Sequence, residues 1–179
     1  MRYPIPDGVH HWARKHCTNE AFNGTTLLKQ GTGQYVGYIA EAVFGIWLGE
    51  NEFPFIHIGQ ESFDADFQIE NLTFDVKAKN RSVLPLPHYT AHVLHSQKTQ
   101  KTLYYVFSSV LMVKDRAACC DLMGWIRKDQ FWAQAEEVKQ GTEYENGMRE
   151  RAPASTIPYS ALNSMDSLAN NLKVFLKSL

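Results

Sequence analysis

The sequence predicts an α/β fold with a mixed central β-sheet flanked by helices. Gln34–Leu48 is apolar almost all round, as is typical of a buried helix. Leu103–Val113 is a nearly continuous run rich in Val, Tyr and Phe, which indicates a strand covered on both faces. Phe63–Ile69 and Leu72–Ala78 alternate apolar and polar residues around Glu70-Asn71, which predicts a hairpin.

The length of 179 residues suits one domain. We expect it to span residues 1–179, with an N-terminal arm to about residue 30, a core over 31–140 and an extension over 141–179. Before the hairpin, the expected elements are a short helix over Val9–Phe22, the buried helix closed by Gly49, and a strand or extended arm over Pro54–Ile58. After the hairpin, they are a polar stretch over His88–Lys101 that is compatible with a helix, strands over Leu103–Val113 and Cys119–Ile126, a helix over Lys128–Lys139 capped by Asp129 and stopped by Gly141, an extended piece over Ala154–Pro158, and a helix over Ser164–Leu176.

Composition excludes several classes of protein. A net charge of −1 argues against a chain coated in basic charge, although a local basic stripe is compatible with it. The three cysteines do not suggest a disulfide framework or a zinc site, and we expect free thiols in a reducing compartment. No secretory signal and no membrane-spanning run is evident, so we expect a soluble cytoplasmic protein without a membrane partner.

The expected hairpin places charges on one side of the sheet. Side chains alternate between the two faces of a strand, so Asp75 and Lys77 lie opposite the apolar Phe74 and Val76. If both hairpin strands turn their apolar rows to one core, Asp66 joins Asp75 and Lys77 on the other side. The alternative is a solvated face with Asp–Lys pairs, each worth about 0–1 kcal/mol.

Glu41 makes that alternative less suitable, because it is the only charged residue between Gln30 and Gly49. A buried carboxylate needs a cap, an ion pair or a metal. If Glu41, Asp66 and Asp75 converge, each close pair of carboxylates repels by roughly 4 kcal/mol at an effective dielectric near 20. One lysine does not neutralise three acids, whereas a hard divalent ion such as Mg²⁺ or Mn²⁺ suits oxygen ligands.

These residues resemble the active-site signature of the PD-(D/E)xK nuclease superfamily, which has the restriction-endonuclease-like fold. The matching segments are Gly37-Tyr-Ile-Ala-Glu41, Ala65-Asp66-Phe67 and Phe74-Asp75-Val-Lys77. Ala65 stands where the proline of the family's name would be. The order of elements resembles the family over residues 31–140, including the strand Tyr104–Val113.

The resemblance implies an endonuclease that hydrolyses DNA phosphodiester bonds with Mg²⁺, for which Mn²⁺ would substitute. Asp66 and Asp75 would coordinate the ion, with the main-chain carbonyl of Val76 as a further ligand. Glu41 would complete the metal shell or hold a metal-bound water. Lys77 would orient or deprotonate the attacking water and stabilise the charged phosphate.

Basic and polar residues beyond the signature are candidates for contacts with the phosphate backbone. They are Lys79, Arg81, Gln97, Lys98 and Lys101. A solvated loop and a solvated helix face are the alternatives. The histidines His88, His92 and His95 have helical spacing, which indicates a polar face or nucleic-acid contacts rather than a metal site.

Cleavage of both strands would suit a homodimer, and the expected setting is a bacterium or the host cell of a phage. The alternative function is a catalytically inactive nucleic-acid-binding module on the same fold. A carboxylate hydrolase such as a glycosidase is a third possibility, but two acids suffice for that chemistry and it does not need Lys77.

Overall fold

The computed structural model describes residues 1–17, 32–59, 64–144 and 149–179. Its helices are α1 (Asp7–His16), α2 (Thr32–Glu50), α3 (Lys128–Gln134) and α4 (Met165–Lys177), with the short 3-10 turns η1 (His95–Gln97) and η2 (Tyr159–Ala161). Its strands are β1 (Arg2–Pro4), β2 (Ile56–His57), β3 (Phe67–Ile69), β4 (Leu72–Arg81), β5 (Thr90–Leu94), β6 (Tyr104–Val113), β7 (Arg116–Arg127), β8 (Glu136–Val138) and β9 (Ala154–Pro158). The predicted α/β class is confirmed.

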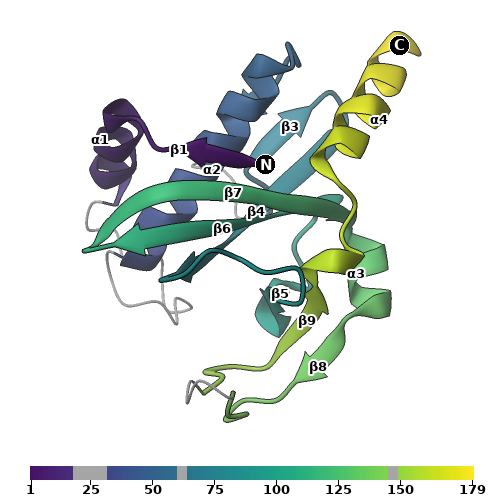
Figure 1. Cartoon of the computed structure of the whole chain (residues 1–179). Helices are drawn as coiled ribbons and strands as arrows, with labels where there is room; N and C mark the ends of the chain where they lie inside the picture. Colours follow the sequence, from purple (N-terminus) through teal and green to yellow (C-terminus); the bar gives the residue numbers. More distant parts are fainter. Residues whose placement is uncertain (18–31, 60–63, 145–148) are drawn as a thin grey trace.

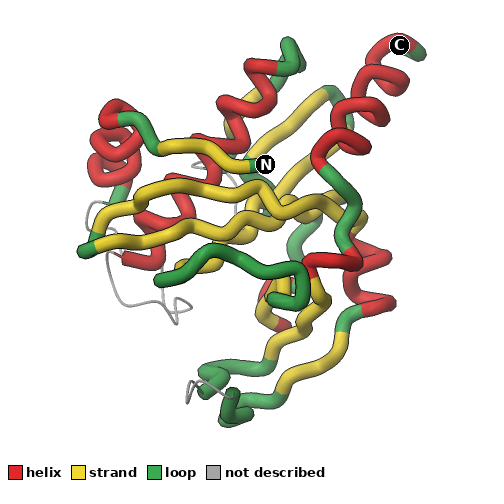
Figure 2. The backbone as a smooth tube through the Cα atoms, viewed as in Figure 1, coloured by secondary structure: helices red, strands yellow, loops and turns green. Residues whose placement is uncertain are grey.

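The described strands form two sheets (Figures 1 and 2). The larger has six strands in the order β1-β7-β6-β4-β3-β2, and the smaller has three in the order β5-β9-β8. In the larger sheet β4 and β6 run parallel, whereas every other neighbouring pair is antiparallel, so the predicted mixed sheet is also confirmed. The parallel pair places β4, with its charged residues, inside the sheet between β3 and β6.

The two faces of the larger sheet are covered differently. On one face α1, α2 and α4 pack over a core that includes Trp47, Phe44 and Phe74. On the other face the small sheet and α3 cover Tyr105 and Phe107. The strand period of two explains the division, because Phe74 and Val76 of β4 turn to the helices while Asp75 and Lys77 turn to the second layer.

Several predicted boundaries are wrong in detail. Helix α1 ends at His16, earlier than predicted, and the predicted end at Phe22 lies outside the described residues. Helix α2 continues through Gly49 to Glu50, because that exposed turn has no neighbour to stop it. The hairpin strands are β3, which starts only at Phe67, and β4, which runs on to Arg81. Strand β7 is longer than predicted at both ends.

The stretch His88–Lys101 is not a helix. Residues 90–94 form strand β5, whose Ala91 and Val93 are buried against the second core while β5 pairs antiparallel with β9. The histidines therefore do not share a helical face. His92 lies 3.1 Å from Oε2 of Glu150, and His95 lies 3.0 Å from the hydroxyl of Ser155.

The helix predicted over Lys128–Lys139 is also shorter. It ends at Gln134 because Glu136–Val138 extend as β8 and pair with β9. Asp129 does not cap this helix and instead forms an ion pair with Arg127. The extended piece Ala154–Pro158 is confirmed as β9, and α4 is confirmed as a helix whose N-terminal Ser164 accepts a hydrogen bond from the Ser167 amide.

Gly124 is required by the backbone of β7. Its φ is +150°, and it lies where the register between β6 and β7 shifts. A Cβ at this position would lie 2.5 Å from the carbonyl oxygen of Asn163. We expect Gly124→Ala to lower the free energy of unfolding by about 2–3 kcal/mol through steric overlap.

Equilibrium denaturation measures this effect. The matched control is Gly49→Ala, because a Cβ there meets nothing within 4 Å and alanine in a helix is more stable than glycine by roughly 0.5–1 kcal/mol. If Gly124→Ala is as stable as the parent, the backbone at Asn163 can move away to make room for the added Cβ, which would contradict this prediction.

Candidate active site

Asp75 and Lys77 form a buried ion pair on β4. The Lys77 ammonium lies 2.5 Å from Oδ2 of Asp75, and the two side chains are only 11% and 6% exposed. Lys77 also donates to Oε1 of Gln100 at 3.1 Å, and its Nζ lies 5.5 Å from the centre of the Tyr105 ring. Because two acceptors hold the ammonium, the direction of its N–H groups is fixed.

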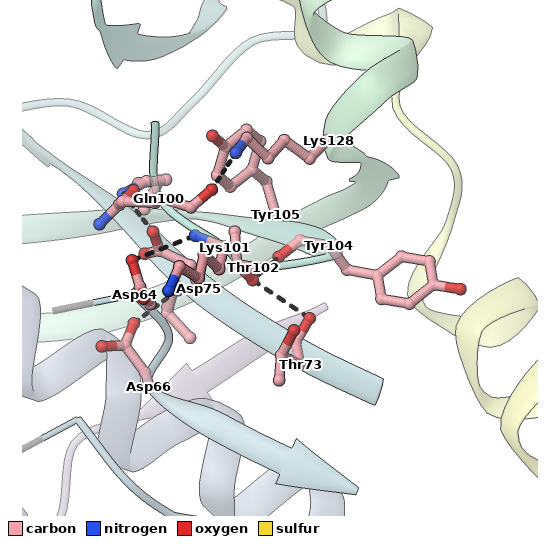
Figure 3. Close-up of polar contacts among 12 residues, drawn as sticks. Asp64, Asp66, Thr73, Asp75, Gln100, Lys101, Thr102, Tyr104, Tyr105 and Lys128 are labelled. Carbon is pink, nitrogen blue, oxygen red and sulfur yellow. Dashed lines mark hydrogen bonds and ion pairs between the residues drawn. The ribbon is translucent and has the colours of Figure 1, made fainter. Parts of the chain in front are cut away.

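Asp66 approaches the same strand from the residue just before β3. Its backbone N–H donates to the Phe74 carbonyl, which holds the residue at the end of the hairpin ladder. Its Oδ2 accepts a 2.7 Å hydrogen bond from the backbone N–H of Val76. Figure 3 shows Asp66 and Asp75 close together, with Gln100 beside them.

The buried and negatively charged surroundings of Asp66 raise the pKa of its carboxyl group. Burial raises the pKa of its carboxyl well above 3.8, and the negative charges of Asp75 and Glu41 raise it further. The Val76 amide and the Lys77 ammonium act in the opposite direction. The ionised form of Asp66 is thus disfavoured in the folded protein, and a bound cation would favour it.

Glu41 reaches the site from the middle of α2. Its Oε2 lies 3.0 Å from Nε2 of His57, which belongs to the edge strand β2. A Cβ built on Gly59 would lie 3.1 Å from Oδ1 of Asp66, 3.3 Å from Oε2 of Glu41 and 3.3 Å from Nε2 of His57. Three side-chain atoms therefore lie close around Gly59, and a larger residue at this position would crowd them.

The donor set suits a hard ion that keeps part of its water. Within residues 1–17, 32–59, 64–144 and 149–179, no three His, Cys, Asp or Glu side chains form a group that could hold a metal on their own. Mg²⁺ in proteins is usually held by one or two carboxylates and retains several waters. The carboxylates of Asp66 and Glu41 fit such a partly hydrated ion, because both face the space beside Gly59.

The predicted catalytic residues thus lie in one region, and the role of each remains a prediction. At Val76 the structure shows the N–H in contact with Asp66, whereas its carbonyl as a ligand stays a prediction. Sequence reasoning missed His57 and Gln100. Gln100, and not the predicted phosphate contact Gln97, is the glutamine that accepts a hydrogen bond from Lys77.

Two further missed residues support Gln100 and Lys77 (Figure 3). The Lys128 ammonium donates to the backbone carbonyl of Gln100. The Tyr105 hydroxyl, whose pKa burial raises to about 12, accepts a 3.3 Å hydrogen bond from the Trp132 indole. No pattern in the sequence singles out these residues, because their contacts join the segment after β5 to β6 and α3.

The predicted nucleic-acid contacts occupy two kinds of position. Lys98 and Lys101 are exposed, and Gln97 is half-buried in η1. Lys79 and Arg81 are half-buried on the face of β4 that carries Lys77. The Arg81 guanidinium lies 4.3 Å from the centre of the Tyr89 ring, and burial lowers the pKa of Lys79. These two cations are therefore set deeper in the molecule than a surface phosphate contact requires.

No known protein family, no curated protein and no solved structure matches this chain. None of the described helices is both long and apolar enough to span a membrane.

Proposed function

We propose that the chain is a Mg²⁺-dependent endonuclease on a restriction-endonuclease-like fold, and that it hydrolyses DNA phosphodiester bonds. One observation carries this proposal: the negative charges of Asp75 and Glu41, which come from two different elements, both act on the buried carboxyl of Asp66 in a loop. Glu41 comes from α2, Asp66 from the residue before β3, and Asp75 from β4. Their charges disfavour the ionised form of Asp66, which a bound cation would favour, and such perturbed groups cluster at functional sites.

The chain's own residues would divide the work as follows. Asp66, Asp75 and Glu41 would hold the ion, which supplies a Lewis acid and lowers the pKa of bound water. The Lys77 ammonium has three N–H donors, of which Asp75 and Gln100 accept two. We assign the third to a non-bridging phosphate oxygen or to the attacking water. The water oxygen bonds to phosphorus and gives up one proton to the solvent, one P–O ester bond breaks, and the leaving oxygen takes up a proton in exchange.

A binding module without catalysis is the second candidate. Its support is that Lys77 and Asp75 already neutralise each other as an ion pair. Either function would use the exposed Lys98 and Lys101 beside the site. If both strands of a duplex are cut, we further propose a homodimer, which light scattering would detect as a doubled mass.

A cleavage panel separates the two functions. Supercoiled, linear, branched and single-stranded DNA are incubated with Mg²⁺, Mn²⁺ or EDTA, using the parent and Asp75→Ala. We expect cleavage that requires the metal and falls by about 100-fold or more in Asp75→Ala, because removal of a charge-stabilising group commonly has that effect.

The matched control is Asp129→Ala, which removes an exposed carboxylate paired with Arg127 far along the chain from the signature. It should cleave like the parent. Tight DNA binding with no cleavage under any metal would favour the binding module, and cleavage that persists in EDTA would contradict the metal site.

A further inference from the structure

A small aromatic pocket adjoins the candidate active site. It has a volume of about 170 Å³, and its lining includes Trp12, Phe55, His57 and Phe67 together with Gly45 and Glu41. The ring centres of Trp12 and His57 are 5.9 Å apart, and those of His57 and Phe67 are 4.8 Å apart. Glu41 thus borders both this pocket and the point beside Gly59 where the acids meet.

We propose that the aromatic pocket holds one unpaired nucleobase of the strand that is cut, which makes DNA with unpaired nucleotides the preferred substrate. The inference rests on the proposed function and names its substrate class. A nucleobase is flat and aromatic, and aromatic walls bind any base by stacking. The volume is below the roughly 300–1,000 Å³ of pockets for drug-sized ligands, so it suits a single ring system.

The polar border of the pocket suits a base as well. Glu41 offers carboxylate oxygens, and His57 offers a ring nitrogen 3.0 Å away from them. The edge of a nucleobase carries both donors and acceptors, which such a pair can read. Trp12 belongs to helix α1. The last turn of that helix contains the basic residues Arg14, Lys15 and His16. Their charge is complementary to the phosphates on either side of the bound base.

The width of the pocket depends on a glycine. Gly45 lies one helical turn after Glu41 on α2, and a Cβ there would lie 3.5 Å from the Phe67 ring and 3.9 Å from the Phe55 ring. A longer side chain at this position would enter the space between those rings. Because a base must leave the stack to reach the pocket, unpaired, branched or end-frayed nucleotides would be cut faster than intact duplex.

The test removes a base from the substrate and the Trp12 ring from the pocket, first separately and then together. An abasic nucleotide is placed at successive positions around the cut in a single-stranded substrate, and Trp12→Ala is compared with the parent. We expect the abasic nucleotide at one position to slow cleavage by the parent about 5- to 100-fold, the range expected for one stacked base. In Trp12→Ala the same abasic nucleotide should cause little further loss, since the stacking partner is already gone.

Three further variants distinguish loss of the pocket from misfolding. Gly45→Leu should fill the pocket and reproduce the loss, while Gly49→Leu makes the same substitution in the same helix where a Cβ meets nothing within 4 Å. Trp12→Phe should retain most of the activity because it keeps a ring. Thermal melting of each variant reports whether it is folded.

The outcomes separate the two proposals. Metal-dependent cleavage that is insensitive to abasic nucleotides, or equally sensitive in the parent and Trp12→Ala, would overturn the pocket proposal and leave the nuclease intact. If no DNA is cut, the nuclease proposal fails. DNA binding by the parent and by Trp12→Ala is then measured by fluorescence anisotropy with intact and abasic DNA. Equal affinities for all four combinations would overturn the pocket proposal too.

Discussion

Replacing Lys77 with methionine is expected to lower the rate of DNA cleavage by about 100- to 10,000-fold, the range for loss of a charge-stabilising donor or a general acid–base group. Methionine keeps most of the side-chain length and removes the ammonium. The effect should fall mainly on kcat, because Lys77 is assigned to the charge that develops on the phosphate and to the attacking water. Single-turnover cleavage measures it without interference from product release.

The same substitution has a second signature that only an ion-paired lysine would give. Lys77 is 11% exposed and Asp75 is 6% exposed, so Lys77→Met leaves a buried carboxylate without its cation. Breaking one side of a buried pair typically costs about 3–5 kcal/mol. Addition of Mg²⁺ should therefore raise the melting temperature of Lys77→Met more than that of the parent, since the ion replaces the lost positive charge.

Lys173→Ala is the matched control, because Lys173 is an exposed lysine on α4. It should leave both the rate and the melting temperature close to the parent values. Lys77→Arg is a stricter comparison: the planar guanidinium is a poor substitute where a compact ammonium must fit between Asp75 and Gln100. Full activity in Lys77→Met with an unchanged response to Mg²⁺ would remove Lys77 from the proposed mechanism.

The parts of the site that the sequence predicts are those set by local periodicity. Alternation along one strand is enough to place Asp75 and Lys77 on the same face, and the structure has them 2.5 Å apart. The absence of any other charge between Gln30 and Gly49 is enough to single out Glu41, which is only 14% exposed. Both deductions need no knowledge of how distant segments meet.

The missed residues depend on long-range pairing. Strand β2 has only two residues, so no alternation marks His57 before β2 pairs with β3. Gln100 reaches Lys77 only because the chain returns from β5 into β6, which lies beside β4. The helix expected over His88–Lys101 fails for the same reason: pairing of β5 with β9, far along the chain, outweighs the local helical spacing of the histidines.

Asp66→Asn is expected to stabilise the protein in EDTA at neutral pH while abolishing its stabilisation by Mg²⁺. The parent must keep a buried carboxylate beside the charges of Asp75 and Glu41, which disfavour its ionised form. Asparagine removes that charge, and its side-chain oxygen can still accept from the Val76 amide that now bonds Oδ2. We expect a gain in the free energy of unfolding at neutral pH, because a raised pKa means that ionisation of Asp66 costs more in the folded protein than in the unfolded chain.

The pH dependence of this difference has a definite sign. The pKa of Asp66 is raised above 3.8 in the folded protein, so between 3.8 and the raised value the folded state binds more protons than the unfolded state. The stability of the parent relative to Asp66→Asn should therefore fall as the pH rises through that interval, and stay constant below it. Denaturation in EDTA at a series of pH values measures the slope.

The change in melting temperature on addition of Mg²⁺ distinguishes a metal site from a structural ion cluster. In the parent the ion should bind the ionised carboxylates, offset their repulsion and raise the melting temperature progressively as its concentration increases. In Asp66→Asn, which we expect to be inactive but folded, this increase should disappear. Asp129→Asn, at an exposed carboxylate, should respond to Mg²⁺ like the parent. If Asp66→Asn is instead less stable than the parent in EDTA, the acids are held by partners that already compensate their charge, and the structure has no need of a metal at this position.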